Sequence, residues 1–243
     1  MTPFGHCNRM NDFGVSLATA AHLILNADAA LVRIVALSLA VSGSACLLAA
    51  FFGLGGGAGL AVARFPGHRV LVLLLNTLLA LPSVVVGLVV YLLLSRSGPL
   101  GSLGILFTPS AMVVAQTILV LPVVAALTRQ LVSDALRGSG DQLRSMGAGP
   151  MTRATLVLVH ERWAVLTVML TAFGRAISEV GAVMIVGGNI DGVTRVMTTT
   201  IALETSKGDL PLALALGLVL LLVVGAINVL IALVQRFSKE GRR

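Results

Sequence analysis

Long apolar stretches separated by short polar segments make up most of the 243-residue chain. A helix needs about 20 apolar residues to cross the hydrocarbon core of a bilayer. Stretches of that length predict spans over residues 31–54, 70–94, 110–128, 163–187 and 211–234. The third contains Gln116 and Pro122, which a span tolerates where they face other helices or a cavity. We therefore predict an all-α membrane protein with about five transmembrane helices.

Composition supports the membrane as the solvent of this chain. Hydrophobic residues are 57% and charged residues 11% of the sequence, and the mean hydropathy is +1.00. Soluble domains are about 45–50% apolar and about 25% charged. The two cysteines, Cys7 and Cys46, form no metal-binding or disulfide pattern, so we interpret both as structural. The four histidines are scattered along the chain, which argues against a metal cluster.

The distribution of Lys and Arg predicts the orientation, because cytoplasmic loops carry the excess. With five spans, one side of the membrane holds 11 basic residues and the other 5, and Arg175 lies inside a span. The richer side includes residues 129–162 and the C-terminus. We therefore expect the N-terminus outside and the C-terminus in the cytoplasm. The net charge of +7 is mostly this asymmetry, so it needs no nucleic-acid partner.

The chain divides into three predicted parts. Residues 1–30 form an extracytoplasmic or interfacial segment, residues 31–236 the transmembrane domain, and residues 237–243 a basic cytoplasmic tail. Within the first part, residues 11–25 have apolar positions near helical spacing and predict a short amphipathic helix on the membrane surface. Met10 is an alternative start of the chain.

Two local patterns resemble enzyme motifs but fail on their details. The glycine run FGLGGGAGL over residues 52–60 lacks the Lys and the Ser or Thr of a phosphate-binding loop. Its pairs Gly53/Gly57 and Gly55/Gly59 predict close helix packing or a helix end instead. VHERW over residues 159–163 lacks the second histidine of a zinc-protease helix. We therefore expect no catalytic residue and no metal site.

A polar segment over residues 129–162 separates the third and fourth spans. Its pattern predicts helix, break, helix, with breaks at Gly138, Gly140, Gly147, Gly149 and Pro150. Asp141 could start a short helix, where the helix dipole favours an acid, and Gly147 and Gly149 could end it in a left-handed conformation. The segment is either a solvated loop or a docking element for a cytoplasmic partner.

The second alternative is supported by a resemblance. Permeases of ABC importers carry a cytoplasmic motif of the form E-A-A, three residues, G, nine residues, I-x-L-P. Here it is matched by Asp141-Gln142-Leu143, Gly147 and Val157-Leu158-Val159-His160, with the glycine and the spacing kept. The alanines are replaced by Gln and Leu, and the last proline by His160. Residues 63–101 and 174–209 resemble molybdate- and tungstate-type permeases, the latter stretch most of all the tungstate branch.

The resemblance covers about residues 11–236 and implies a fold and a set of partners. The fold would be that of a type I ABC importer permease with a cytoplasmic coupling-helix loop. A homodimer would work with two cytoplasmic ABC ATPase subunits and an extracytoplasmic tungstate-binding protein in the bacterial inner membrane. ATP would be bound by the ATPase, so this chain would need no cofactor. The implied coupling residues are Asp141, Gln142, Leu143, Met146, Gly147, Ala148 and Gly149.

Polar residues in and after the fourth span are candidates for the anion path or its gate. Arg175 and Glu179 are one turn apart on a predicted helix, so they form an ion pair that holds the bundle or line the path of a dianion. Residues 187–209 are an ordinary external loop or a gate or docking surface. The candidates there are Asn189, Arg195, Thr198 and Thr199. Pro82 and Gly87 would kink a pore-lining helix or relieve packing.

Other classes of protein remain open at this point. The same resemblance allows a molybdate permease. A secondary transporter driven by an ion gradient would show inverted repeats, and none is clear in this sequence. A channel subunit and a membrane enzyme are further alternatives. Dependence on a separate ATPase distinguishes the ABC permease from all of them.

Overall fold

The computed structural model describes residues 18, 21, 22, 25 and 29–240, with the side chains of 139 and 237–240 left out. The amphipathic helix predicted over residues 11–25 falls mostly outside these residues. The described part of the chain is helical and holds no strand. This confirms the all-α fold class.

Most helices are short, and three are long. The described residues form α2 (Ala29–Val62), α3 (His68–Leu78), α4 (Ser83–Leu94), the 3-10 turn η1 (Gly101–Leu103), α5 (Pro109–Ser145), α6 (Pro150–His160), α7 (Arg162–Ile177), α8 (Gly181–Gly187), α9 (Met197–Lys207) and α10 (Leu210–Glu240).

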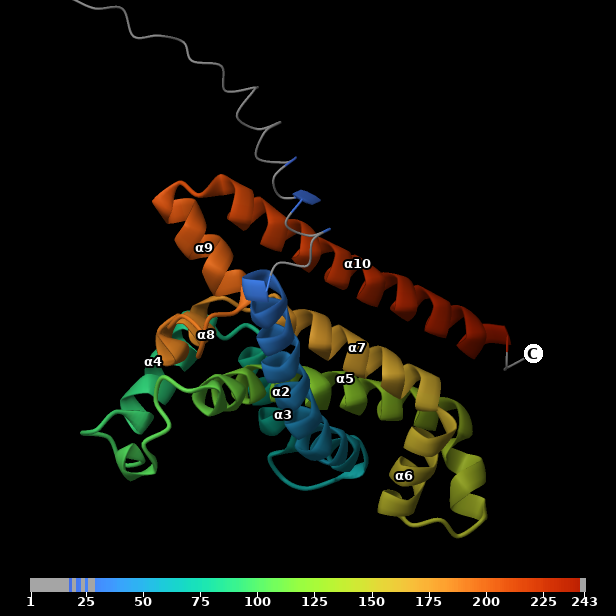
Figure 1. Ribbon diagram of the computed structural model, residues 1–243. Helices are drawn as coiled ribbons and strands as arrows, with labels where there is room; N and C mark the ends of the chain where they lie inside the picture. The colour runs from blue at the N-terminus through green and yellow to red at the C-terminus, as the bar shows by residue number, and fades with distance from the viewer. Residues whose placement is uncertain (1–17, 19–20, 23–24, 26–28, 241–243) are drawn as a thin grey trace, which may run out of the picture.

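The long helices α2, α5 and α10 are each long and apolar enough to cross a membrane, and they contain the first, third and fifth predicted spans. At 1.5 Å per residue, the 34 residues of α2 and the 37 of α5 extend about 51 and 55 Å. Both helices therefore exceed the bilayer core of about 30 Å. Figure 1 shows α2 crossing α5, with α10 along one flank of the molecule beside α7 and α9.

Two further spans are bent pairs of helices. The axes of α3 and α4 differ by 98°, and those of α6 and α7 by 79°. The second predicted span, 70–94, is therefore not one straight helix. It breaks over residues 79–82 because Pro82 has no amide hydrogen and disfavours a helical conformation at the residue before it. The kink expected at Pro82 is therefore a full break between α3 and α4.

The fourth predicted span, 163–187, is also interrupted. α7 ends at Ile177 and α8 begins at Gly181, with Ser178, Glu179 and Val180 between them. α8 packs on α4 through Gly87, where an added Cβ would lie 2.7 Å from the Cα of Ala182. Gly87 therefore serves a close approach of two helices and not a bend.

The glycine run 52–60 lies inside α2, and only one of its two predicted pairs packs closely. A Cβ at Gly57 would lie 2.3 Å from the carbonyl oxygen of Ala125 on α5, and one at Gly53 would lie 2.9 Å from Val124. These glycines let α2 and α5 approach closely. A Cβ at Gly55 would meet nothing within 4 Å, so the second pair has another role or none.

Candidate functional site

The polar segment folds as a helical hairpin formed by the end of α5, the turn Met146–Gly149, and α6. Three details of the prediction are wrong, and two of them concern α5. α5 runs through Gly138 and Gly140 without a break, and Asp141 lies in its last turns instead of starting a helix. Isolated glycines cost a helix only about 1 kcal/mol each relative to alanine, which the apolar length of α5 offsets.

Gly147 forms the turn of the hairpin. Its φ is +79°, in the left-handed region as predicted. Its amide donates to the carbonyl oxygen of Arg144 at 2.9 Å, and the amide of Ala148 donates to that of Leu143 at 3.0 Å. These two bonds make a Schellman cap, which satisfies carbonyl groups at the end of α5. Gly149 has φ −65° and precedes Pro150 as the N-cap of α6, so it is not left-handed.

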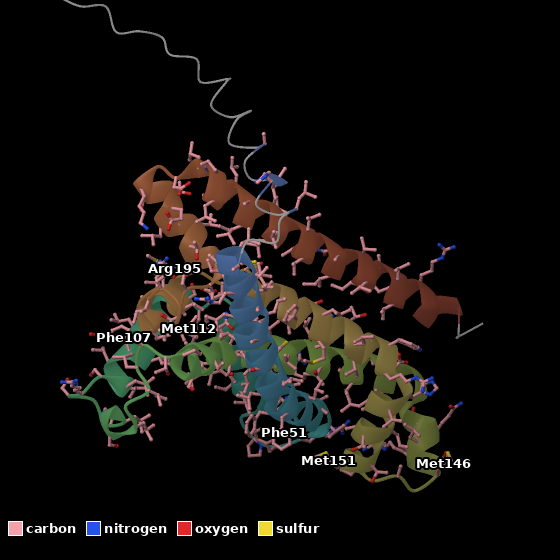
Figure 2. The ribbon with its side chains drawn as sticks, viewed as in Figure 1. Phe51, Phe107, Met112, Met146, Met151 and Arg195 are labelled. Carbon is pink, nitrogen blue, oxygen red and sulfur yellow. The ribbon has the colours of Figure 1, made fainter. Side chains whose placement is uncertain are left out.

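The hairpin presents its tip to the surroundings. The side chain of Met146 is among the most exposed large apolar groups, with 81% of its area accessible. Figure 2 shows it at the turn between α5 and α6. Of the other predicted coupling residues, Asp141, Gln142, Gly147 and Gly149 are exposed, and Leu143 and Ala148 are half-buried. An exposed methionine on a capped, rigid turn suits docking to another protein.

A second polar cluster lies at the opposite end of the molecule, where Figure 2 shows Arg195. The hydroxyl of Thr199 is 2.9 Å from Oδ1 of Asn189, and the amide of Val196 donates to the same hydroxyl at 3.2 Å. Asn189 has φ +49° and its Nδ2 donates to the carbonyl oxygen of Thr199 at 3.4 Å. We call Asn189, Thr194, Val196 and Thr199 the threonine network. It fixes the loop between α8 and α9.

Thr198 links this end to Glu179. Its hydroxyl donates to the carbonyl oxygen of Glu179 at 2.8 Å. The amide of Ala182 donates to Oε1 of Glu179 at 3.4 Å, so the carboxylate lies at the N-terminus of α8, where the helix dipole favours it. Glu179 and Thr198 thus brace the break between α7 and α8.

Glu179 and Thr198 also line a small polar cavity with Ser38, Ser42 and Gln116. Its volume is about 10 Å³, the space of about one water molecule. Nε2 of Gln116 donates to the carbonyl oxygen of Ala176 at 3.0 Å, whereas its buried Oε1 has no partner in the described part of the chain. A tetrahedral oxyanion does not fit in this cavity.

The sequence reading missed Ser38 and Ser42. The hydroxyl of Ser38 accepts a hydrogen bond from the amide of Met197 at 2.8 Å, which ties α2 to the start of α9. Both serines are buried. The sequence did contain a pattern that could have identified them. The two serines are four residues apart inside an apolar span, which places two polar groups on one helix face.

Arg175 and Glu179 do not form the ion pair given as one alternative. Ion pairs within the described residues join Arg137 to Asp134, Arg195 to Asp191 and Lys207 to Glu204. The helical spacing assumed for 175 and 179 is lost because α7 ends at Ile177. Arg175 is exposed on α7, on one face with Thr171 and Ser178.

Arg195, unlike Arg175, forms an ion pair with another described residue. Its Nη1 lies 3.2 Å from Oδ1 of Asp191, and only 20% of its side chain is exposed. The predicted site residues therefore fall into three separate groups: the hairpin, the cluster of Glu179, Asn189, Arg195, Thr198 and Thr199, and Arg175 alone on the surface of α7. No group of three His, Cys, Asp or Glu residues suited to a metal ion is found among the described residues.

The fold and the sites define a class of protein. Up to five spans, a capped hairpin at one end and a polar network at the other describe a multi-pass membrane protein with the features of a permease. No protein-family model matches the chain, but known proteins do.

A tungstate uptake permease of Peptoclostridium acidaminophilum, TupB, is 43% identical over 218 residues, which are 89% of this chain and 95% of the relative. A probable anion ABC transporter permease of Haloferax volcanii is 43% identical over 205 residues, 82% of this chain and 88% of the relative. The sulfate permease CysW of Escherichia coli K12 is 33% identical over 138 residues, 54% of this chain and 47% of the relative. The chain belongs to the family of permease subunits of ABC-type anion uptake systems.

Proposed function

We propose that this chain is the membrane subunit of an ATP-driven importer of tungstate. The observation that carries the proposal is 43% identity to a tungstate uptake permease along 95% of the length of that relative. The relative TupB of Campylobacter jejuni, also a tungstate uptake permease, supports it with 36% identity over 209 residues. The substrate would be the tetrahedral dianion, delivered by an extracytoplasmic binding protein.

The hairpin is the element that an ATPase subunit would move. Arginines concentrate at this end of the molecule, at the close of α2 and along α5 and α6, and by the positive-inside rule this supports a cytoplasmic location of the hairpin. The exposed Met146 and the turn at Gly147 would seat in a groove of the ATPase. The ATPase subunit would bind and hydrolyse ATP, and this chain would need no cofactor.

α5 offers a direct route from the hairpin to the far end. It is continuous over 37 residues, from Ser145 at the hairpin to Pro109. Gln116 on α5 donates a hydrogen bond to the end of α7. Met112 on α5 packs against Gly187 at the end of α8, where an added Cβ would lie 3.0 Å from the methionine sulfur. A push on the hairpin that shifts α5 would therefore reach the ends of α7 and α8 together.

One copy of the chain offers no path for the anion through its polar cavity, because that cavity holds about one water. A polar face is instead exposed on α7, where Thr171, Arg175 and Ser178 follow at helical spacing. Exposed polar groups in a span face a cavity or another protein and not lipid. We infer that two copies enclose the path, with Arg175 as a weak attraction for the dianion.

Uptake of labelled tungstate tests this function. Cells lacking the gene are complemented with the wild-type gene or an empty vector, and molybdate and sulfate are added as competitors. We expect uptake only with the gene and persistence of uptake in excess molybdate. Equal competition by molybdate would keep the family and broaden the substrate. Uptake that does not depend on the gene would overturn the proposal.

A second arm separates the ABC permease from a secondary transporter. The catalytic glutamate of the partner ATPase is replaced, and the membrane potential is collapsed with an ionophore in a parallel culture. We expect the ATPase variant to lose uptake. We expect the culture with the collapsed potential to keep uptake, provided that its ATP level is held constant. The reverse pattern would indicate a transporter driven by an ion gradient.

A further inference from the structure

A cleft of about 700 Å³ opens beside the hairpin, between the end of α2, the last turns of α5 and the start of α6. Four arginines line it, from all three elements: Arg64, Arg137, Arg144 and Arg153. Asp141 is the one acid among the lining residues. The cleft is therefore strongly positive and suited to an anion.

Most of this positive charge is not neutralised by ion pairs among the described residues. Arg137 pairs with Asp134 at 3.2 Å, but the other three arginines take part in no ion pair of the described residues. Nε of Arg153 is buried and has no hydrogen-bond partner there. A buried donor without a partner is costly, and guanidinium groups bind phosphate oxygens in pairs. These features point to an oxyanion group such as a phosphate.

An apolar groove of about 570 Å³ continues from the cleft between α2 and α3. The two share Gly59 and Ala63. The walls are leucines of α3 and the floor is the glycine face of α2, where a Cβ at Gly55 or Gly56 would meet nothing within 4 Å. Gly55 and Gly56 are thus the glycines of the run on which no other described helix packs within 4 Å.

We propose that the cleft and the groove together bind one anionic phospholipid. Its phosphate would lie among Arg64, Arg144 and Arg153, and an acyl chain would lie along Gly55 and Gly56. A free oxyanion would use the cleft alone and leave the apolar groove without an occupant. Basic clefts between helices at the cytoplasmic surface suit anionic head groups. Figure 2 shows Met151, another lining residue, between the lower end of α2 and α6.

The bound lipid would connect α2 to the hairpin. The end of α2 contributes Arg64, and the hairpin contributes Arg144 and Arg153, so one phosphate would bridge both elements. Anionic lipid would then stabilise the base of the hairpin while leaving its tip, Met146 to Gly149, free. This inference does not depend on which anion is transported.

The test is lipid binding to the purified full-length chain in mild detergent. Phosphatidylglycerol with a fluorescent acyl chain is titrated against phosphatidylcholine with the same chain. We expect at least tenfold tighter binding of phosphatidylglycerol, weakened by salt because the contact is ionic. Arg64→Gln with Arg144→Gln should remove this preference. Both side chains are exposed, so the fold should tolerate the change. The matched control is Arg33→Gln with Arg96→Gln, two exposed arginines at the start of α2 and just after α4.

A second pair of variants tests the groove. A Cβ at Gly56 would meet nothing within 4 Å, so the side chain of Gly56→Leu should extend into the groove and weaken binding of phosphatidylglycerol at least fivefold. Gly225→Leu on α10, where a Cβ also meets nothing within 4 Å, should leave binding unchanged.

Three results would overturn the proposal. Equal binding of both lipids would exclude a site for an anionic head group. Full displacement by inorganic phosphate, with no effect of Gly56→Leu, would indicate a site for a free oxyanion. A change in oligomeric state with Gly56→Leu, at unaltered lipid binding, would show that a second copy of the chain fills the groove.

Discussion

Two turns of this protein have the same backbone and different surroundings. Gly147 ends α5 with φ +79°, and Gly208 ends α9 with φ +84°. At both, the next residue donates its amide back to a carbonyl group five positions earlier: Ala148 to Leu143 and Asp209 to Glu204, each at 3.0 Å. Both turns are Schellman caps. Figure 1 shows them at opposite ends of the molecule.

The surroundings of the two turns differ in charge. The turn at Gly147 lies beside a cleft with four arginines and exposes Met146. Next to the turn at Gly208, Lys207 is paired with Glu204 at 3.0 Å, and the threonine network at the start of α9 is neutral. The same local cap therefore occurs at two ends whose surrounding side chains differ, and we expect those side chains, and not the cap, to decide what each end binds.

The largest expected effect comes from Gly147→Asp. A Cβ at Gly147 would meet nothing within 4 Å in the described part of the chain, so the carboxylate would project from the tip of the hairpin toward the proposed ATPase. We expect at least a tenfold loss of tungstate uptake, with the protein still in the membrane and ATP hydrolysis by the complex retained. Uptake and ATPase assays on the same membranes measure both.

Gly104→Asp is the control for backbone strain. Gly104 has φ +60° and also has open space around a Cβ, but it lies in the turn after η1. A left-handed residue with a side chain costs about 1–2 kcal/mol at either place. Equal loss of uptake in both variants would assign the effect to folding, and normal uptake by Gly147→Asp would exclude the hairpin from coupling.

A smaller effect is expected from Thr199→Val in the threonine network. The change keeps the shape and removes the hydroxyl that contacts Asn189 and Val196 in a buried place. Leaving buried groups unpaired costs about 1–3 kcal/mol. At about 2–4 °C per kcal/mol, the melting temperature in detergent should fall by about 2–12 °C. The exposed Thr205→Val on the same helix is the control, and an equal change in both would contradict a stabilising network.

Asp134→Asn should have the smallest effect. It removes the ion pair between Asp134 and Arg137. The side chain of Asp134 is 52% exposed and that of Arg137 is 78% exposed. Exposed ion pairs contribute about 0–1 kcal/mol, so the melting temperature should change by less than about 4 °C. Loss of uptake without loss of stability would show that Asp134 acts in coupling.

The sequence predicted the parts of this fold that depend on apolar length. The spans within α2, α5 and α10 follow from such stretches, and the left-handed Gly147 follows from its place after a helical pattern. A kink at Pro82 was one of two alternatives from the sequence, and the structure turns it into a full break. The break after Ile177 did not follow, because it depends on tertiary contacts such as that of α8 with Gly87. The same break separates Arg175 from Glu179.

Packing also decided the roles of the glycines. From the sequence, Gly53/Gly57 and Gly55/Gly59 are equivalent pairs, yet only the first faces α5. Gly138 and Gly140 resemble helix breakers and lie inside α5. The polar cavity around Gln116 could be found only in three dimensions, since its residues come from α2, α5, the end of α7, the break before α8 and the start of α9.

Labelling of Met146→Cys tests the central claim most directly. Cys7 and Cys46 are first replaced by alanine, and Thr205→Cys, exposed near the other turn, is the matched variant. A membrane-impermeant maleimide should label Cys at 146 only in inside-out vesicles and Cys at 205 only in right-side-out vesicles. Purified ATPase subunits should protect position 146 and leave position 205 reactive. Labelling of position 146 from the outside, or unchanged labelling with the ATPase bound, would contradict a cytoplasmic coupling hairpin.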